Sequence, residues 1–297
     1  MRIHRISFDK ATHHWMRFFS LFLLLLPICI CLGLVWKSLP ILQEHSLSVL
    51  LFTADWKPMS KTFGFAAFIV SSLWVTLLAL LFAAPVCILS AIHLTQYAPR
   101  RVVKVMQPVV DILAGIPSVV YGVWGLLNIV PWVSHTLAPA LGYETSGYNI
   151  LSASIVLAVM IIPFILNILI EIFRNIPLEL QESSLALGAN RWYTIKYVLM
   201  RKAFPGIISA LGLGLSRAFG ETMAVMMVAG NVSRMPTGAF QAGYPLPALI
   251  ANNYGEMMSI PLYDSALMLA ALILFIIVLA FNLISRLLIL HYEKISK

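Results

Sequence analysis

Residues 203–231 read AFPGIISALGLGLSRAFGETMAVMMVAGN, and this stretch decides the fold class. It is apolar over enough residues to cross a lipid bilayer as a helix, apart from Arg217 and Glu221. In a continuous α-helix a spacing of four residues places both side chains on one face, about one turn apart. A charged group at membrane depth costs about 3 kcal/mol or more, so we expect this pair to have a function.

The whole chain has the composition of a membrane protein. Of its 297 residues, 60% are hydrophobic and only 11% are charged, which excludes an ordinary soluble domain. The hydrophobic stretches predict one all-α polytopic membrane domain with six transmembrane helices, each long enough for a hydrocarbon core of about 30 Å. The predicted spans are residues 17–36, 66–93, 106–130, 149–172, 203–230 and 265–290.

The distribution of Lys and Arg predicts the orientation. Fifteen of the 20 lie in connections on one side, four (Lys37, Lys57, Lys61 and Arg234) lie on the other, and Arg217 is inside a span. Because connections rich in Lys and Arg remain in the cytoplasm, we expect both termini to be cytoplasmic. A formal net charge of +8 without a soluble module does not predict a nucleic-acid partner.

These spans predict the organisation of the chain. Residues 1–16 are expected to form a cytoplasmic N-terminal segment, 17–36 an uncleaved first transmembrane helix, and 37–65 a periplasmic loop. Residues 66–290 are expected to form a core of five transmembrane helices, followed by a cytoplasmic tail at 291–297.

No motif in the sequence predicts covalent chemistry. A phosphate-binding loop, a zinc-protease motif and a catalytic triad are all absent from it. Cys29, Cys31 and Cys87 lie inside predicted spans, where small apolar packing is the simplest role for them. We therefore predict no catalytic residue, metal or cofactor, and any ATP hydrolysis must take place on another subunit.

The polar connection at residues 174–202 contains the signals of a short helix. Pro177 suits a first helical turn, Glu179 favours the positive end of the helix dipole, and Gly188 suits a left-handed stop. Residues 177–188 are therefore predicted to form a helix. Its leucines give it an apolar stripe, which fits either a groove on a partner protein or the surface of the membrane.

Two other segments carry signals with two interpretations each. Pro117 is expected to bend the third span, and the nearby glycines at 115, 122 and 125 favour either tight helix packing or a translocation path. In the Pro- and Gly-rich outer connection, residues 246–250 are apolar. They either turn back toward the membrane or belong to an ordinary external loop.

Residues 182–188, with the sequence ESSLALG, resemble the E-A-A-x-x-x-G loop of binding-protein-dependent ABC importer permeases. This resemblance implies the type I importer permease fold and a coupling helix that docks into an ATPase subunit. Glu182 and Gly188 match the motif, whereas Ser183 and Ser184 replace its two alanines. Arg201 stands where many members of the family have proline.

Residues 215–231, with the sequence LSRAFGETMAVMMVAGN, resemble the signature of the phosphate-specific permeases, closest to the PstC-type subunit. The runs IPSVVYG at 116–122 and WKP at 56–58 are also similar to this family. The resemblance implies a bacterial inner-membrane protein that transports phosphate. It also implies three partners: a PstA-type sister permease, a PstB-type ATPase dimer and a PstS-type periplasmic phosphate-binding protein.

Helix geometry gives a separate reason to expect a solute path at the fifth span. Arg217 can donate two parallel hydrogen bonds to an oxyanion, and Glu221 can pair with it when the path is empty. We therefore assign Arg217, Glu221 and Thr222 to the substrate path, with a static ion pair between the two charged groups as the alternative. Small or modest side chains share this face within about 80°, and would leave room for a solute: Gly206, Ala210, Gly214, Ala224 and Val228.

The sequence thus predicts a permease subunit that forms half of the path of an ATP-driven phosphate importer. Sulfate or molybdate is the alternative substrate, since an arginine in a path does not discriminate among tetrahedral oxyanions. An ion-coupled secondary carrier with Glu221 as its proton site, and a membrane sensor that signals through its partners, are functions of other classes. Neighbouring genes for an ATPase, a second permease and a secreted binding protein would favour the importer.

The charge distribution makes a testable prediction about topology. In a variant without the native cysteines, we expect a membrane-impermeant thiol reagent to label Ser60→Cys and Thr237→Cys from outside intact cells. Asn190→Cys should react only after the membrane is opened. Labelling of Asn190→Cys in intact cells would show that the orientation is the reverse.

Overall fold

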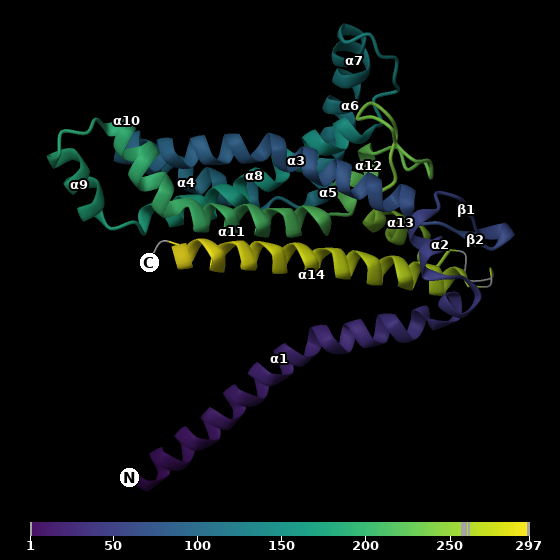
Figure 1. Ribbon diagram of the computed structural model, residues 1–297, viewed down its shortest axis with the longest axis horizontal. Coiled ribbons are helices and arrows are strands. Elements are labelled where there is room, and N and C mark those ends of the chain that lie inside the picture. The colour runs from purple at the N-terminus through teal and green to yellow at the C-terminus, as the bar shows by residue number, and fades with distance from the viewer. Residues whose placement is uncertain (1, 257–259, 261, 296–297) are drawn as a thin grey trace.

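The computed structural model describes residues 2–256, 260 and 262–295, which form a bundle of long helices (Figure 1). The long helices of the bundle are α1 (Arg2–Glu44), α3 (Ala66–Ile92), α4 (Arg100–Gly115), α8 (Ile150–Arg174), α11 (Met200–Phe219) and α14 (Tyr263–Ile295). Shorter helices connect them: α2 (Leu47–Phe52), α5 (Ser118–Trp124), α6 (Val130–Trp132), α7 (Ala138–Ala140), α9 (Leu178–Ala186), α10 (Arg191–Tyr193), α12 (Met223–Val228) and α13 (Leu246–Asn253).

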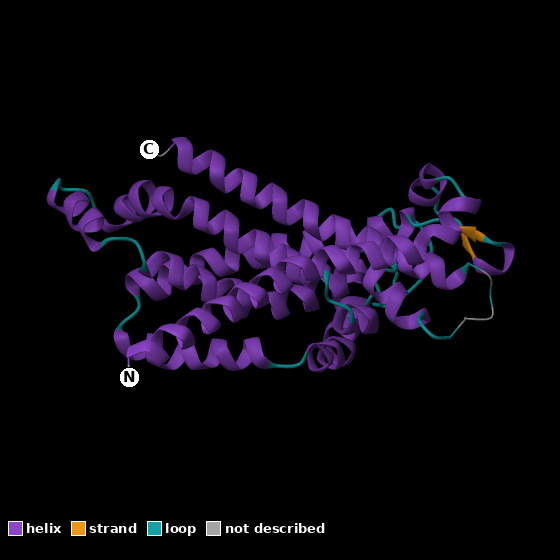
Figure 2. Cartoon of the chain, turned by 90° about the horizontal axis from the view of Figure 1, so that it is seen from below, coloured by secondary structure: helices purple, strands orange, loops and turns teal. Residues whose placement is uncertain are grey.

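The remaining regular structure is small. Strands β1 (Trp56–Lys57) and β2 (Thr62–Phe63) pair antiparallel around a 3₁₀ turn at Pro58–Ser60. Four π-helical turns continue the α-helices that they adjoin: His93–Tyr97, Gly125–Ile129, Val133–Leu137 and Thr194–Leu199. Helices therefore make up most of the chain that the structure describes, as Figure 2 shows.

Five described helical stretches are long and apolar enough to cross a membrane unbent, and a sixth is a bent pair. The five are Thr12–Glu44, Ala66–Tyr97, Ile150–Arg174, Arg191–Phe219 and Tyr263–Tyr292. The pair is Arg100–Gly115 with Ser118–Ala140, and its two parts meet at 92°. Six spans and a bend in the third were predicted, and both predictions are confirmed.

The bend has a local cause at Pro117. Proline lacks an N–H to continue the helix and disfavours helical backbone in the residue before it. Ile116 accordingly has ψ 130°, and α4 ends one residue earlier, at Gly115. The Tyr121 hydroxyl donates a 2.8 Å hydrogen bond to the Leu113 carbonyl oxygen, which ties the two sides of the bend together.

The predicted bounds of three spans were wrong. The third, predicted at 106–130, is the bent pair that reaches from Arg100 to Ala140. The first helix begins at Arg2, so the expected N-terminal segment is helical and continuous with it. The fifth helical stretch covers Arg191–Phe219 rather than 203–230. It starts early because Asn190 caps it, accepting a 2.7 Å hydrogen bond from the backbone N–H of Tyr193.

The core of the bundle lies between α3 and α8, which pack against each other along most of their length. Four small residues of α3 recur every fourth position and are completely buried: Ala79, Ala83, Cys87 and Ala91. Small side chains allow two helices to approach closely, and van der Waals contact then stabilises the pair. Helix α11 packs against both α8 and α3 and completes this core.

A second buried cluster lies at the end of the molecule that carries β1, β2 and α13 (Figure 1). Trp56 is partly buried against it, with its ring centroid 5.1 Å from that of Phe68 and 5.5 Å from those of both Phe63 and Phe65. The cluster includes residues of the end of α1, of α13 and of α14. The first half of α1, by contrast, stands away from the other helices, and its side chains from Thr12 to Ile30 are exposed.

The apolar segment at 246–250 folds back into the protein rather than forming an open loop. It starts α13, where Leu246, Ala248 and Leu249 are completely buried. The backbone N–H groups of Tyr244 and Leu246 donate to the Ser71 and Ser72 hydroxyl oxygens of α3, at 3.1 and 2.8 Å. The two bonds give partners to backbone N–H groups where the non-helical chain enters α13. Buried backbone N–H groups require such partners.

Close packing of α11 on α8 makes a prediction about stability. A Cβ added at Gly214 would overlap the Ile165 side chain of α8, so Gly214→Leu should destabilise the fold by about 1–3 kcal/mol. We expect a lower thermal unfolding temperature of the detergent-solubilised protein than for Leu213→Ala, a change at an exposed neighbouring position. Equal unfolding temperatures for the two variants would contradict this account of the α8–α11 contact.

Candidate functional site

Arg217 lies in the last turn of α11 and is exposed in the isolated chain. The carbon of its guanidinium group is 4.7 Å from the centroid of the Phe164 ring on α8. An aromatic face attracts a cation, and stacking leaves the edges of the guanidinium, with its N–H donors, available. The residue is thus held in place without its charge being neutralised.

Glu221 does not pair with Arg217, contrary to the geometry predicted from the sequence. The prediction assumed one continuous helix, but α11 ends at Phe219 and α12 starts only at Met223. No ion pair joins Arg217 to Glu221, both of which the structure describes. Instead Glu221 Oε1 accepts a 3.2 Å hydrogen bond from the backbone N–H of Ala224, in the first turn of α12.

The break between α11 and α12 has a local explanation. Gly220 follows the last helical residue with a φ of −83°, and Glu221 then supplies an acceptor for one free N–H group of the next helix. The Thr222 hydroxyl donates to the Gly220 carbonyl oxygen at 3.3 Å, inside the same break. Glu221 and Thr222 are both partly exposed. Both lie in the interruption between α11 and α12, a few residues after Arg217.

The small residues predicted to leave room for a solute instead pack against neighbouring helices. Ala210, Ala224 and Val228 are completely buried. A Cβ at Gly206 would meet the Ile172 side chain, and one at Gly214 would overlap Ile165, both on α8. Of the predicted face, only Arg217, Glu221 and the partly exposed Gly206 remain accessible, so this face is mainly a packing surface.

The bend at Pro117 brings α5 to the same region. Helix α5 packs against α12, the helix that follows Arg217 after the break at Gly220. Gly122 allows α5 to pack tightly on α12, since a Cβ there would lie 2.6 Å from the Met227 sulfur. This contact gives Gly122 a packing role. It also places the helix after the Pro117 bend against the helix after the Gly220 break.

Sequence reasoning missed a set of polar contacts between α4 and α8. Asn167 Nδ2 donates to Asp111 Oδ1 at 2.9 Å, and Arg174 Nη2 donates to Gln107 Oε1 at 3.0 Å. A signal was present in the sequence, since Gln107 and Asp111 are four residues apart, and Asn167 and Arg174 are seven apart. Exposed polar groups are costly against lipid, so this face of the bundle meets water or protein rather than lipid chains.

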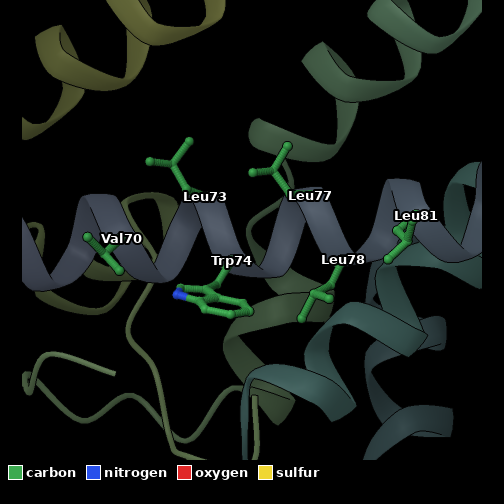
Figure 3. Close-up of a pocket in the computed structure, with 6 residues that line it drawn as sticks. All are labelled: Val70, Leu73, Trp74, Leu77, Leu78 and Leu81. Carbon is green, nitrogen blue, oxygen red and sulfur yellow. The ribbon is translucent and has the colours of Figure 1, made fainter. Parts of the chain in front are cut away.

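The opposite kind of surface lies along α3. Figure 3 shows a groove of about 490 Å³ whose lining side chains all come from this helix and carry no charge. They are Val70, Leu73, Trp74, Leu77, Leu78 and Leu81. This surface suits lipid chains or an apolar helix, and it offers nothing to bind an oxyanion.

The predicted docking segment forms α9, which covers residues 178–186 of the predicted 177–188. Pro177 directly precedes its first residue, and Gly188 has the left-handed φ of 84° that was expected. Glu182 and Ser183 are exposed, whereas a 2.9 Å hydrogen bond joins the hydroxyls of Ser184 and Thr194. Four leucines of the segment are exposed, by 37 to 90%: Leu178, Leu180, Leu185 and Leu187.

Comparison with known proteins decides the family. Residues 83–294 match the model of the family described as "Binding-protein-dependent transport system inner membrane component". The chain belongs to this family. The matched residues include α9, Arg217 and the break at Gly220, while α1 and the hairpin precede them.

Members of this inner membrane component family are similar to the chain over nearly its whole length. The phosphate transport system permease protein PstC of Xylella fastidiosa is 34% identical, covering 92% of this chain and 88% of that protein. PstC of Pasteurella multocida is 36% identical, covering 94% and 90%. The probable ABC transporter permease protein YqgH of Bacillus subtilis is 36% identical, covering 90% and 86%.

A solved structure supports the fold. The MetNI methionine ABC transporter in an inward-facing conformation matches with a TM-score of 0.58 and 21% identity, covering 75% of this chain and 93% of that chain. The chain therefore has the fold of a type I ABC importer permease, as was predicted. The likeness concerns the fold alone, since the identity is low.

Proposed function

We propose that the chain is the membrane-spanning permease subunit of an ATP-driven phosphate importer in a bacterial inner membrane. The observation that supports this most strongly is the 34 to 36% identity, over more than nine-tenths of the chain, to permeases named for phosphate transport. The exposed, unneutralised guanidinium of Arg217 in a membrane-spanning helix is consistent with an anionic solute. Phosphate is therefore favoured over sulfate and molybdate by the relatives, and over a cation by the charge.

In this proposal Arg217 is the group that phosphate meets in the path. Its planar guanidinium can donate two parallel hydrogen bonds to one oxyanion while its face rests on Phe164. Glu221, held by the N–H of Ala224, would keep a negative charge near the path without cancelling that of Arg217. Such a nearby carboxylate weakens anion binding, and weak binding allows release.

The partners follow from the same proposal. A PstA-type sister permease would complete the path, a PstS-type protein would deliver phosphate outside, and a PstB-type ATPase dimer would bind α9 inside. The first turn of α1 and the last turn of α14 point toward the same end of the molecule as α9 (Figures 1 and 2). This arrangement agrees with both termini and the docking helix being cytoplasmic.

The role of Arg217 can be tested by transport. With the complete transporter in membrane vesicles, Arg217→Gln should lower phosphate uptake by about tenfold or more, because a charge-assisted hydrogen bond to the solute is lost. Arg217→Lys should restore little, since lysine lacks the planar fork. Arg201→Gln, at the other end of α11, is the matched control and should transport normally. Near-normal uptake by Arg217→Gln at wild-type abundance would show that Arg217 has a structural role only. Uptake of sulfate but not phosphate by the wild-type transporter would show that the proposed substrate is wrong.

The docking of α9 can be tested at Gly188. A Cβ at this position meets nothing within 4 Å, so a larger residue causes no clash within the chain itself and its effect must come from the φ of 84°. A β-branched residue is strongly disfavoured there, so Gly188→Val should uncouple ATP hydrolysis from uptake, with transport reduced about tenfold. Gly188→Asn tolerates this conformation and should stay close to wild type. Equal transport by both variants would show that the turn does not matter for coupling.

A further inference from the structure

Arg191 joins two parts of the chain that are 95 residues apart in sequence. Its Nη2 donates a hydrogen bond to the Gln96 carbonyl oxygen, at the end of the helix that α3 begins. The carbon of the same guanidinium lies 4.8 Å from the centroid of the Tyr97 ring. One side chain thus holds the end of that helix by a hydrogen bond and by stacking at once.

On one side of this contact, α9 is firmly attached to the helix that Arg191 starts. The Gly188 N–H donates to the Leu185 carbonyl oxygen at 2.9 Å, which closes the turn after α9. The Ser184–Thr194 hydrogen bond then joins α9 to the first turns of the next helix, where Thr194 is buried. A displacement of α9 therefore carries Arg191 with it.

On the other side of the contact, Tyr97 is followed by Ala98, Pro99 and α4. Val110 is the one buried residue among the 16 of α4, so this helix is loosely packed. Its side-chain hydrogen bonds to α8 are the two polar ones from Asn167 and Arg174. Prolines 99 and 117 flank α4 and Pro108 lies inside it, and the Leu113 carbonyl oxygen near its end accepts the hydrogen bond from the Tyr121 hydroxyl of α5. A shift of α4 against α8 can therefore pass through this bond to α5, which packs on α12 just after Arg217 and the break.

We propose that Arg191 is a positioning residue that transmits displacement of α9 to α4. The proposal depends on the ATP-driven transport proposed above but not on the identity of the solute. Arginine suits the task because its planar group stacks and donates together, which a lysine ammonium does not. If Arg191 only satisfies a free carbonyl at the end of a helix, its loss would lower stability and leave the movement of α4 intact.

The test is a distance measurement on the assembled transporter reconstituted in lipid, with the native cysteines replaced by alanine. One spin-label pair reports α9 (Ala186 with Leu279 on α14), and a second reports α4 (Val105 with Leu279). In the wild type we expect both distances to change between the nucleotide-free state and the ATP–vanadate-trapped state. In Arg191→Ala the α9 distance should still change, whereas the α4 change should fall at least twofold and solute uptake per ATP at least fivefold.

The matched control is Lys196→Ala, since the Lys196 Nζ lies 5.1 Å from the centroid of the Tyr197 ring of its own helical stretch and so makes its cation–π contact within one element. It should leave both distance changes as in the wild type. A full α4 change in Arg191→Ala overturns the proposal. If that variant does not assemble, Tyr97→Leu is measured instead, and a full α4 change there overturns the proposal equally. Absence of phosphate uptake by the wild type would count against the proposed substrate alone, because the distances report movement driven by ATP.

Discussion

The close contact between α3 and α8 is the constraint on which the rest of the fold depends. Alanines and one cysteine at every fourth position of α3 let the two backbones approach, and the larger side chains of α8 fill the space between them. Helix α11 then packs against both of them, and its Gly206 and Gly214 admit Ile172 and Ile165 of α8. The position of Arg217 over Phe164 follows from that second contact.

Two interruptions of helical backbone bring the functional candidates together. Proline at 117 turns α5 away from α4 by a steric effect, and the Gly-Glu-Thr run at 220–222 separates α12 from α11 by capping. Backbone of this kind is tolerated at membrane depth only against protein or water, so it is expected beside a path rather than beside lipid. The polar contacts between α4 and α8 likewise indicate a surface that faces water or protein. The groove on α3, by contrast, carries no charge.

The sequence predicted those features whose cause is local. The six spans, the bend at Pro117 and the short helix before Gly188 were found because hydropathy, proline and a left-handed glycine act within a few residues. The break at Gly220 was missed because glycine is also common inside membrane helices, where it does not end them. The face of Gly206, Ala210 and Gly214 was misjudged for another reason: small residues indicate close approach without saying what approaches. The contact of Arg191 with Tyr97 joins distant segments and has no local signal.

The second cluster has a consequence for the biogenesis of this protein. It joins the end of α1 to α13 and α14, the first helix of the chain to the last. These contacts cannot exist until the final helix has left the ribosome and entered the membrane. During synthesis the end of α1 must therefore wait for these partners, whereas Trp56 of the hairpin can already contact Phe65 and Phe68, and the α3–α8 pair can assemble. The contacts of α1 with α13 and α14 form only in chains that have been synthesised to α14.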